Sequence, residues 1–401
     1  MRLTNHGKKA VEGLEVFIVC NPGFAQGTKL RFDRLAPGET RRVFPIELQP
    51  DHAYLADLQE SVNASVTVSV LAGSIEIATK SQNMQVLAYD QWAGTRALPE
   101  LLAAFCMPNN PAIDVVIGKA SKLLRSQYND LSMNGYQSKS RDVVWKQVSA
   151  IYSTISAENL QYAEPPASFG TDGQKIRTAD RILEGRVATC LDLTMLFCSC
   201  LEQAGLRPVV LFKEGHAWVG VWLHLACFPD PLLDDIQAVR KRVDSGEFLA
   251  FETTGVAQHH TRRLSLRIAL ERGQEHLQEK DTFRYAVDIH RAREVQIKPL
   301  PSRSTLTKLL PTEASEALSG IEPTPLMPTK SAAPVTALIS VWLTRGLEDA
   351  IWWVLSVMAV PTTLVRRPET GTDSVNTFWK GLAGAFLGFG PLTGGSTLRA
   401  K

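Results

Sequence analysis

The sequence predicts an α+β protein: a β-sandwich over residues 1–95, an α+β domain over residues 96–300, and a segment of undefined structure over 301–401. Apolar and polar residues alternate with a period of two in the N-terminal part, which is typical of half-buried strands. Near residue 96 the apolar spacing becomes helical, and short β-like runs return after residue 207. Helices followed by antiparallel-looking strands indicate an α+β domain.

Short strands with turn signals between them fill the N-terminal part. An apolar run covers residues 16–20 and ends at the turn-forming pair Asn21-Pro22. Residues 66–70 and 74–77 alternate around Ala72-Gly73, which predicts a hairpin. A turn near Gly38 leads to another expected strand over residues 43–46. Several short strands within a hundred residues favour a small β-sandwich, for which we expect a binding, packing or spacer role.

Composition excludes several classes of function. The 43 Lys and Arg residues nearly balance the 41 Asp and Glu residues, so the net charge of +2 gives no global attraction to nucleic acid or anionic lipid. We therefore expect no nucleic-acid partner for this chain itself. The sequence contains no P-loop and no Gly-x-Gly-x-x-Gly between a strand and a helix, so we expect no nucleotide cofactor. Six cysteines are too few for a disulfide scaffold, and no apolar stretch follows the first residues, which predicts a cytoplasmic chain with reduced thiols.

The C-terminal part differs in character from the rest. Residues 300–335 are rich in Pro, Ser and Thr, which predicts a linker. Residues 350–365 carry no charge, but this stretch falls short of the roughly 20 apolar residues that a membrane span needs. A buried or interfacial helix is the preferred interpretation and membrane attachment is the alternative.

Three residues within 177–254 form a candidate catalytic triad. Cys190 stands at the expected start of an apolar helix, where the helix dipole favours a thiolate. The dipole contributes only about 0.3–1 kcal/mol, which is less than one pKa unit, so the thiol also needs a cationic histidine as a partner. His216, at the start of an expected strand, can be that partner, and Glu252, at the end of the next strand, can orient its ring.

Each triad residue also has a purely structural interpretation. Cys190 can be an inert core thiol, His216 a satisfied structural histidine, and Glu252 a strand-end glutamate in solvent. Cys198 and Cys200 fall inside the apolar helix and are expected to be core residues. They have no matching partners at zinc-ligand spacing, so we expect no metal site.

Three further residues are candidates for supporting the site. Gln174 precedes the cysteine and either donates to an oxyanion or is an ordinary loop glutamine. Asp192 follows the cysteine by two residues, and we favour a structural role for it at the helix start. Trp218 is expected to form an apolar wall beside the site.

The order of these motifs resembles a known fold. Thr189-Cys190-Leu191-Asp192 on a helix, Gly215-His216-Ala217-Trp218 on a strand, and Glu252-Thr253-Thr254 resemble the transglutaminase-like fold of the papain-like cysteine enzymes. The commonest third member of that fold is Asp, and Glu252 is one methylene longer.

One branch of that fold resembles this chain more closely, over about residues 14–260. In these large bacterial proteins a β-sandwich and a transglutaminase-like domain precede a superfamily 1 helicase and a Vsr-like endonuclease domain. The residues that carry the resemblance are Leu-Leu-Ala-Ala-Phe at 101–105, Pro108-Asn109, Gly-Tyr-Gln at 135–137, Tyr162 with Pro165-Pro166, Gly-Gln-Lys-Ile-Arg at 173–177, and Thr-Cys-Leu-Asp-Leu at 189–193.

The resemblance implies thiol chemistry on an amide or peptide bond of a peptide or protein substrate. Cys190 would attack the carbonyl, His216 would transfer the proton, and Glu252 would orient the imidazole, with hydrolysis or acyl transfer as the outcome. The alternative is a catalytically silent module that recognises a peptide or protein, such as a sensor related to the N-terminal part of helicase–nuclease proteins in anti-phage defence.

Overall fold

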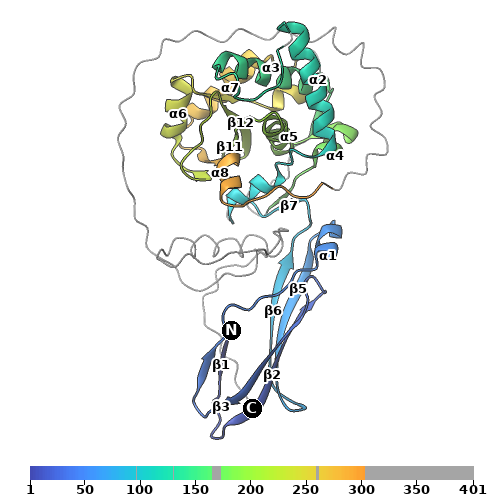
Figure 1. Cartoon of the computed structure of the whole chain (residues 1–401), viewed down its shortest axis with the longest axis vertical. Helices are drawn as coiled ribbons and strands as arrows, with labels where there is room; N and C mark the ends of the chain where they lie inside the picture. The colour runs from blue at the N-terminus through green and yellow to red at the C-terminus, as the bar shows by residue number, and fades with distance from the viewer. Residues whose placement is uncertain (96, 130, 165–172, 259–261, 303–401) are drawn as a thin grey trace. The chain divides into compact units, whose positions relative to one another are not determined.

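The computed structural model describes residues 1–302 except 96, 130, 165–172 and 259–261 (Figure 1). The described residues fall into two compact units, one built from 1–98 and 173–175 and the other from 99–164 and 176–302. The expected apolar segment at 350–365 and nearly all of the expected linker lie outside the described residues. None of the helices in the described part combines the length and apolar character needed to cross a membrane.

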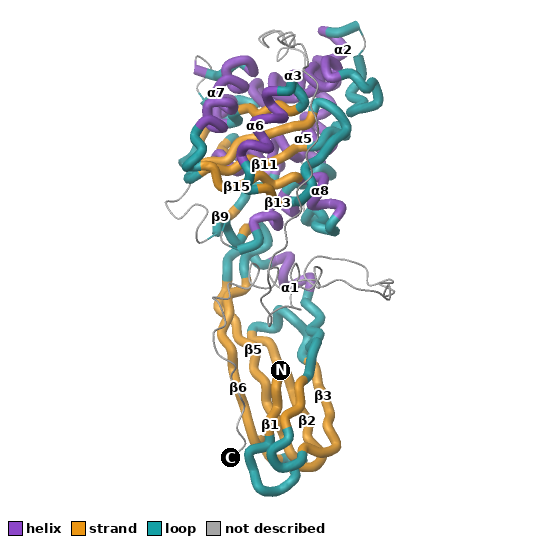
Figure 2. Tube along the Cα trace, turned by 90° about the vertical axis from the view of Figure 1, so that its left-hand side faces the viewer, coloured by secondary structure: helices purple, strands orange, loops and turns teal. Residues whose placement is uncertain are grey.

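The first unit contains an open four-stranded antiparallel sheet. Its strand order is β3 (Thr28–Leu35), β2 (Val11–Asn21), β5 (Val62–Ala72) and β6 (Ile75–Val86). The long strands are orange in Figure 2. The strand and the hairpin predicted from residues 16–20 and 66–77 correspond to β2 and to the β5–β6 pair. Alternate residues of β2 (Leu14, Val16, Ile18) are buried, which is the expected consequence of period-two alternation.

A second, smaller layer covers the core of this sheet. It includes the two-stranded pair β1 (Arg2–Thr4) and β4 (Thr40–Arg42) and the short helix α1 (His52–Asp57), and Leu3 and Leu48 lie in the same apolar cluster as β2. The strand predicted over residues 43–46 is wrong, because β4 ends at Arg42. Pro45 has no backbone N–H to donate to a ladder, which disfavours a strand there. The pair β7 (Gln91–Trp92) and β9 (Gln174–Lys175) completes this unit.

The second unit is built on a five-stranded antiparallel sheet. Its order is β13 (Leu232–Leu233), β15 (Phe283–Asp288), β11 (Pro208–Lys213), β12 (His216–Trp222) and β14 (Phe248–Phe251). Strands β11 and β12 lie inside the sheet, and helices pack against it. Both strands are therefore apolar along nearly their whole length. The strands predicted after residue 207 correspond to β11, β12 and β14.

The helix α5 (Cys190–Gln203) packs against β11, β12, α2 (Pro111–Gln127) and α3 (Arg141–Ala157). It is buried on all sides from Cys190 to Leu201, so its sequence is a continuous apolar run without a polar face. Cys198 and Cys200 are fully buried in it. Figures 1 and 2 show the helices around this sheet. The remaining helices are η1 (Pro99–Phe105), α4 (Ala179–Gly185), α6 (Ile236–Asp244), η2 (Thr254–Ala257), α7 (Leu266–Gln278) and α8 (Ile289–Glu294).

These elements confirm the mixed α+β class of the described chain. The helical spacing near residues 98–105 produces the 3₁₀ helix η1, whereas the spacing near 117–124 and 143–155 belongs to α2 and α3. Asn110 and Ser140 accept hydrogen bonds at the starts of α2 and α3, as expected for N-cap residues.

Candidate active site

Cys190 is the first residue of α5, directly after the N-cap Thr189. The preceding strand β10 (Val187–Ala188) pairs in parallel with β8 (Gln161–Tyr162), which brings Tyr162 opposite Ala188. Tyr162 lies close enough to Cys190 for the thiol to raise the pKa of the Tyr162 hydroxyl. Cys190 is only 1% exposed. The backbone N–H of this position has no carbonyl partner inside the helix, because the first N–H groups of a helix lack one.

Asp192 fixes the start of this helix. The Thr189 hydroxyl accepts from the Asp192 backbone N–H at 3.2 Å, and Asp192 Oδ2 accepts from the Thr189 N–H at 2.9 Å, which completes a capping box. Arg177 donates its backbone N–H to Oδ1 at 2.8 Å and its guanidinium to Oδ2 at 2.7 Å. The Asp192 carboxylate is fully buried and fully engaged in this structural role, as favoured from the sequence.

His216 is placed by the β11–β12 hairpin. A two-residue turn, Glu214-Gly215, joins the strands, and Gly215 has a φ of +69°, a conformation that favours glycine. The register sets His216 directly opposite Lys213. Side chains opposite each other in an antiparallel pair lie on the same face. The imidazole is therefore carried by a rigid strand end beside a lysine.

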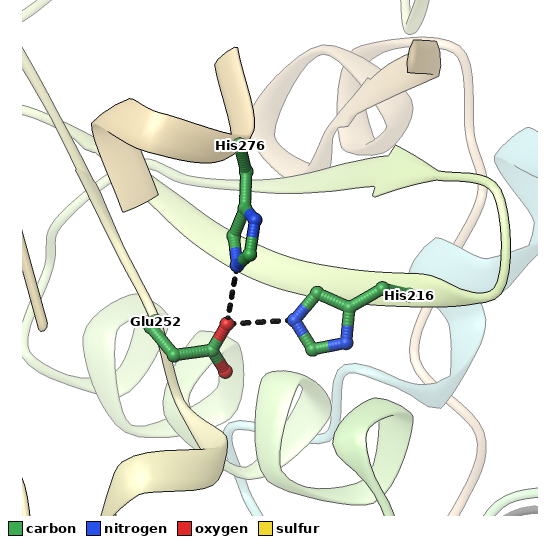
Figure 3. Close-up of side chains that lie close together, drawn as sticks. All are labelled: His216, Glu252 and His276. Carbon is green, nitrogen blue, oxygen red and sulfur yellow. Dashed lines mark hydrogen bonds and ion pairs between the residues drawn. The ribbon is translucent and has the colours of Figure 1, made fainter. Parts of the chain in front are cut away.

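Glu252 follows β14, the strand that pairs with β12. Its Oε2 accepts from His216 Nε2 at 2.7 Å (Figure 3). Its Oε1 accepts from the backbone N–H groups of Thr253 and Thr254 at 2.8 and 2.7 Å, and from the Thr254 hydroxyl at 2.8 Å. Glu252 is 5% exposed, so the alternative of a strand-end glutamate in solvent is wrong.

His216 and Glu252 each stabilise the charged form of the other. Burial raises the pKa of the Glu252 carboxyl, but hydrogen bonds from His216 and from a second histidine, His276, outweigh it and hold that pKa far below its usual range. Burial lowers the pKa of His216, but its side-chain hydrogen bonds with Cys190 and Glu252 raise it to about 9. Since Nε2 is engaged with Glu252, Nδ1 is the ring nitrogen available to Cys190.

Two aromatic side chains border this group. Trp218 is fully buried and lies parallel to the His216 ring, with centroids 6.2 Å apart and an angle of 11°. Burial and the neighbouring Cys190 raise the pKa of Tyr162 to about 12, so its hydroxyl keeps its proton at neutral pH and can donate. The Tyr162 contact was not foreseen as part of the site, although Tyr162 belongs to the motifs that carry the sequence resemblance.

Gln174 belongs to β9 in the first unit, whereas the candidate triad belongs to the second. It is buried, at 6% exposure. The role of Gln174 as an oxyanion donor therefore stays a prediction.

His276 and Lys213 were missed by the sequence reasoning. His276, near the end of α7, donates from Nε2 to Glu252 Oε2 at 2.8 Å, so the two histidines share one carboxylate oxygen (Figure 3). Lys213 Nζ lies 2.8 Å from His276 Nδ1. The position of Lys213 could have been read from the hairpin register. No local motif marks His276, because α7 reaches the site only through tertiary packing against β14.

The cluster of His216, Glu252 and His276 has the residue types of a metal site, with ligand atoms within 4.8 Å of one another. The two nitrogen–oxygen distances of 2.7 and 2.8 Å are hydrogen-bond lengths. Ligands about 2.0–2.1 Å from a tetrahedral zinc ion stand farther apart than this. A metal on His276 Nε2 would also leave a proton on Nδ1 facing the Lys213 ammonium, which is itself only a donor. The arrangement fits shared protons better than a bound metal.

Comparison with known proteins adds no identification: no protein-family model matches this sequence, and no curated protein matches it either. The resemblance to transglutaminase-like domains therefore stays a prediction that rests on the motifs of this chain.

Proposed function

We propose that this protein is a cysteine-dependent enzyme that acts on amide or peptide bonds through Cys190, His216 and Glu252. The observation that carries the proposal is the position of His216: its Nε2 lies 2.7 Å from the buried Glu252 carboxylate, and the nearby Cys190 thiol contributes to its raised pKa. These residues come from a helix start, a strand start and a strand end. A nucleophile, a base and an orienting group in such contact are the components of nucleophilic catalysis.

The chemistry follows from the charges. An imidazole whose pKa is raised to about 9 is protonated at neutral pH, and an imidazolium beside a thiol at a helix N-terminus favours a thiolate. The Cys190 sulfur attacks the carbonyl carbon and forms a C–S bond, while the C–N bond breaks and the departing amine takes a proton from His216. Water or a second amine then attacks the acyl carbon and gives a proton to His216. The C–S bond breaks, which releases the carboxylic acid or the new amide and regenerates the Cys190 thiolate beside the His216 imidazolium.

Two donors near the sulfur suit the oxyanion that forms during attack. The first is the backbone N–H of Cys190, which has no partner within the helix because of its position at the first turn. The second is the Tyr162 hydroxyl, which stays protonated at neutral pH. In the thiolate state the same hydroxyl stabilises the sulfur charge.

A catalytically silent recognition module is the second candidate, favoured by one observation. Cys190 is 1% exposed and lies beside Tyr162, which is also compatible with a thiol that never meets a substrate. The two functions differ in the reactivity of the thiol, because a silent module needs no ion pair.

The test is alkylation of the folded protein with iodoacetamide from pH 5.5 to 9.5, resolved to individual cysteines by peptide mass spectrometry. We expect Cys190 to react well below pH 8, whereas Cys227, whose pKa is raised by burial, serves as an internal control that should react only at higher pH. His216→Phe should remove the low-pH reactivity. Cys190→Ala should change the free energy of unfolding by no more than about 1–2 kcal/mol.

Two results would contradict the enzyme. If Cys190 reacts with the pH dependence of an ordinary thiol, the site is silent. If Cys190→Ala unfolds or aggregates, Cys190 is a core residue.

A further inference from the structure

His276 contributes a second hydrogen bond to the carboxylate that orients the candidate catalytic histidine. Its Nε2 lies 2.8 Å from Glu252 Oε2, and its Nδ1 lies 2.8 Å from Lys213 Nζ. The ring therefore stands between a lysine and the buried glutamate. Its side chain is mostly buried, and its ring centroid is 5.2 Å from that of Trp218.

The partners of His276 select one tautomer. The Glu252 carboxylate, with its strongly lowered pKa, is ionised and only accepts, so His276 Nε2 carries a proton. The Lys213 ammonium only donates, so His276 Nδ1 accepts. The contacts therefore direct the Nε2 proton toward Glu252. In this arrangement His276 relays a hydrogen bond between Lys213 and Glu252.

The charged groups around His276 come from four parts of the sheet and its helices. Lys213 is on β11, His216 on β12, Glu252 follows β14, and Glu279 follows α7. Glu279 accepts from Lys213 Nζ at 2.9 and 3.0 Å through its two carboxylate oxygens. Lys213 is thus paired with Glu279 on one side and with the His276 ring on the other.

We propose that His276 is a positioning residue of this site: it holds Glu252 Oε2 toward His216 and keeps the Lys213 ammonium away from Glu252. The proposal rests on the proposed function of Cys190 and His216. If the ring were absent, the flexible lysine could pair directly with Glu252. A carboxylate neutralised by an ammonium supports an imidazolium less well, because their charges compete for the same partner. The thiolate at Cys190 would then lose part of its counter-charge.

The experiment measures the pH profile of Cys190 alkylation by iodoacetamide in the full chain. His276→Leu removes both the donor and the spacer. We expect its rate at pH 6.5 to fall about ten-fold, the change in thiolate fraction that one pKa unit produces, with the rates converging at pH 9.5. His276→Gln supplies an amide donor at the position of Nε2 and should stay within about three-fold of the wild-type rate.

A double variant separates the two parts of the proposal. In His276→Leu with Lys213→Met no ammonium is left to approach Glu252, so more than half of the loss at pH 6.5 should be recovered. His290→Leu is the matched control, because His290 on α8 is also paired with a glutamate, Glu294 at 3.5 Å, away from the site. It should leave the alkylation profile unchanged.

The outcomes distinguish this inference from the proposed function. If wild-type Cys190 shows ordinary thiol behaviour, the proposed function fails and this inference fails with it. If wild-type Cys190 reacts at low pH and His276→Leu keeps the same profile, only the role of His276 is overturned. Equal loss in the Gln and Leu variants also overturns it. Should the Leu variant not fold, His276→Asn gives the same contrast, since its shorter amide does not reach Glu252; an unchanged profile would again overturn the role.

Discussion

The two carboxylate oxygens of Glu252 accept hydrogen bonds from different groups. Oε1 accepts from three donors on Thr253 and Thr254, which anchor the carboxylate to its own turn. Oε2 is left for the two imidazoles. A buried carboxylate is costly unless it is hydrogen-bonded, and these five contacts satisfy it. The extra methylene relative to Asp allows the side chain to fold back on its own backbone N–H groups while still reaching His216.

This bonding pattern makes Glu252→Gln a sharp test. The amide can present its oxygen to the Thr253 and Thr254 donors, but its NH₂ group then faces the N–H of His216, and two donors repel. The fold should survive, while His216 changes its tautomer or orientation. We expect a loss of the low-pH alkylation of Cys190, and a loss of amide-bond activity of up to about ten-thousand-fold once a substrate is known, as in triads with an amide for an acid. Retained low-pH reactivity would assign the orienting role to another group.

Among individual residues, the sequence predicted those whose local context is informative. Cys190 precedes an apolar helical run and follows an N-cap type, and His216 follows a turn into an apolar strand. His276 lies on an amphipathic helix whose polar face carries many charged residues, so nothing local distinguishes it from a surface histidine. The packing of α7 on β14 brings it to Glu252.

At the scale of elements, the start of α5 is the most constrained feature of the site. The Thr189–Asp192 capping box and the Arg177 contacts fix the first turn, and the Thr194 hydroxyl donates to the Cys190 carbonyl at 2.8 Å. Thr194 also lies 3.4 Å from the Thr253 hydroxyl, which links this helix to the turn that carries Glu252. The segments that carry the nucleophile candidate and the acid are thus linked by a contact between two threonine hydroxyls.

Asp192→Ala should therefore be more damaging than loss of an ordinary cap. It removes the capping box and leaves the buried N–H of Thr189 and the partly buried donors of Arg177 without this acceptor, so we expect about 2–4 kcal/mol of destabilisation. The matched control is Asp235→Ala, which removes the N-cap of α6 in an exposed setting and should cost about 1 kcal/mol. Urea unfolding of both variants provides the comparison. Equal losses would show that the buried network adds nothing to the cap.

The strands and helices of the second unit were more predictable than those of the first. Strands β11 and β12 form continuous apolar runs bounded by Glu214-Gly215, a signal that depends only on neighbouring residues. The layer formed by β1, β4 and α1 carries few periodic residues, and its contribution to the core through Leu3 and Leu48 depends on contacts distant in sequence. Patterns of two to four residues cannot reveal such contacts.

For the molecule as a whole, the site makes stability depend on pH in two opposite ways. The His216 pKa is raised from 6.5 to about 9, so its contribution is fully present below pH 6.5 and is lost as the pH rises through about 9. The Glu252 pKa is lowered, so its contribution is present above its unfolded value of about 4.3 and is lost as the pH falls toward the folded value. The contribution of the pair is therefore greatest between about pH 4.3 and 6.5.

This dependence predicts that the free energy of unfolding changes differently with pH in the wild type and in Glu252→Gln. The full His216 shift, to which Cys190 and Glu252 both contribute, corresponds to about 3.4 kcal/mol as an upper limit. The part that comes from Glu252 should be lost from the wild type between pH 6.5 and 9 and should be absent from the variant. Cys198 and Cys200, fully buried in α5, report unfolding of the second unit when a brief pulse of thiol reagent is applied across a urea series. Both proteins receive the same pulse at each pH. The difference between their free energies of unfolding then does not contain the pH dependence of the reagent reaction or of titrating groups that the two proteins share. If the free energy of unfolding depends on pH in the same way for both proteins, His216 gains no charge-dependent stabilisation from Glu252. We expect instead that the wild-type free energy of unfolding falls more steeply above pH 6.5, because its imidazolium is held between the thiol and the carboxylate.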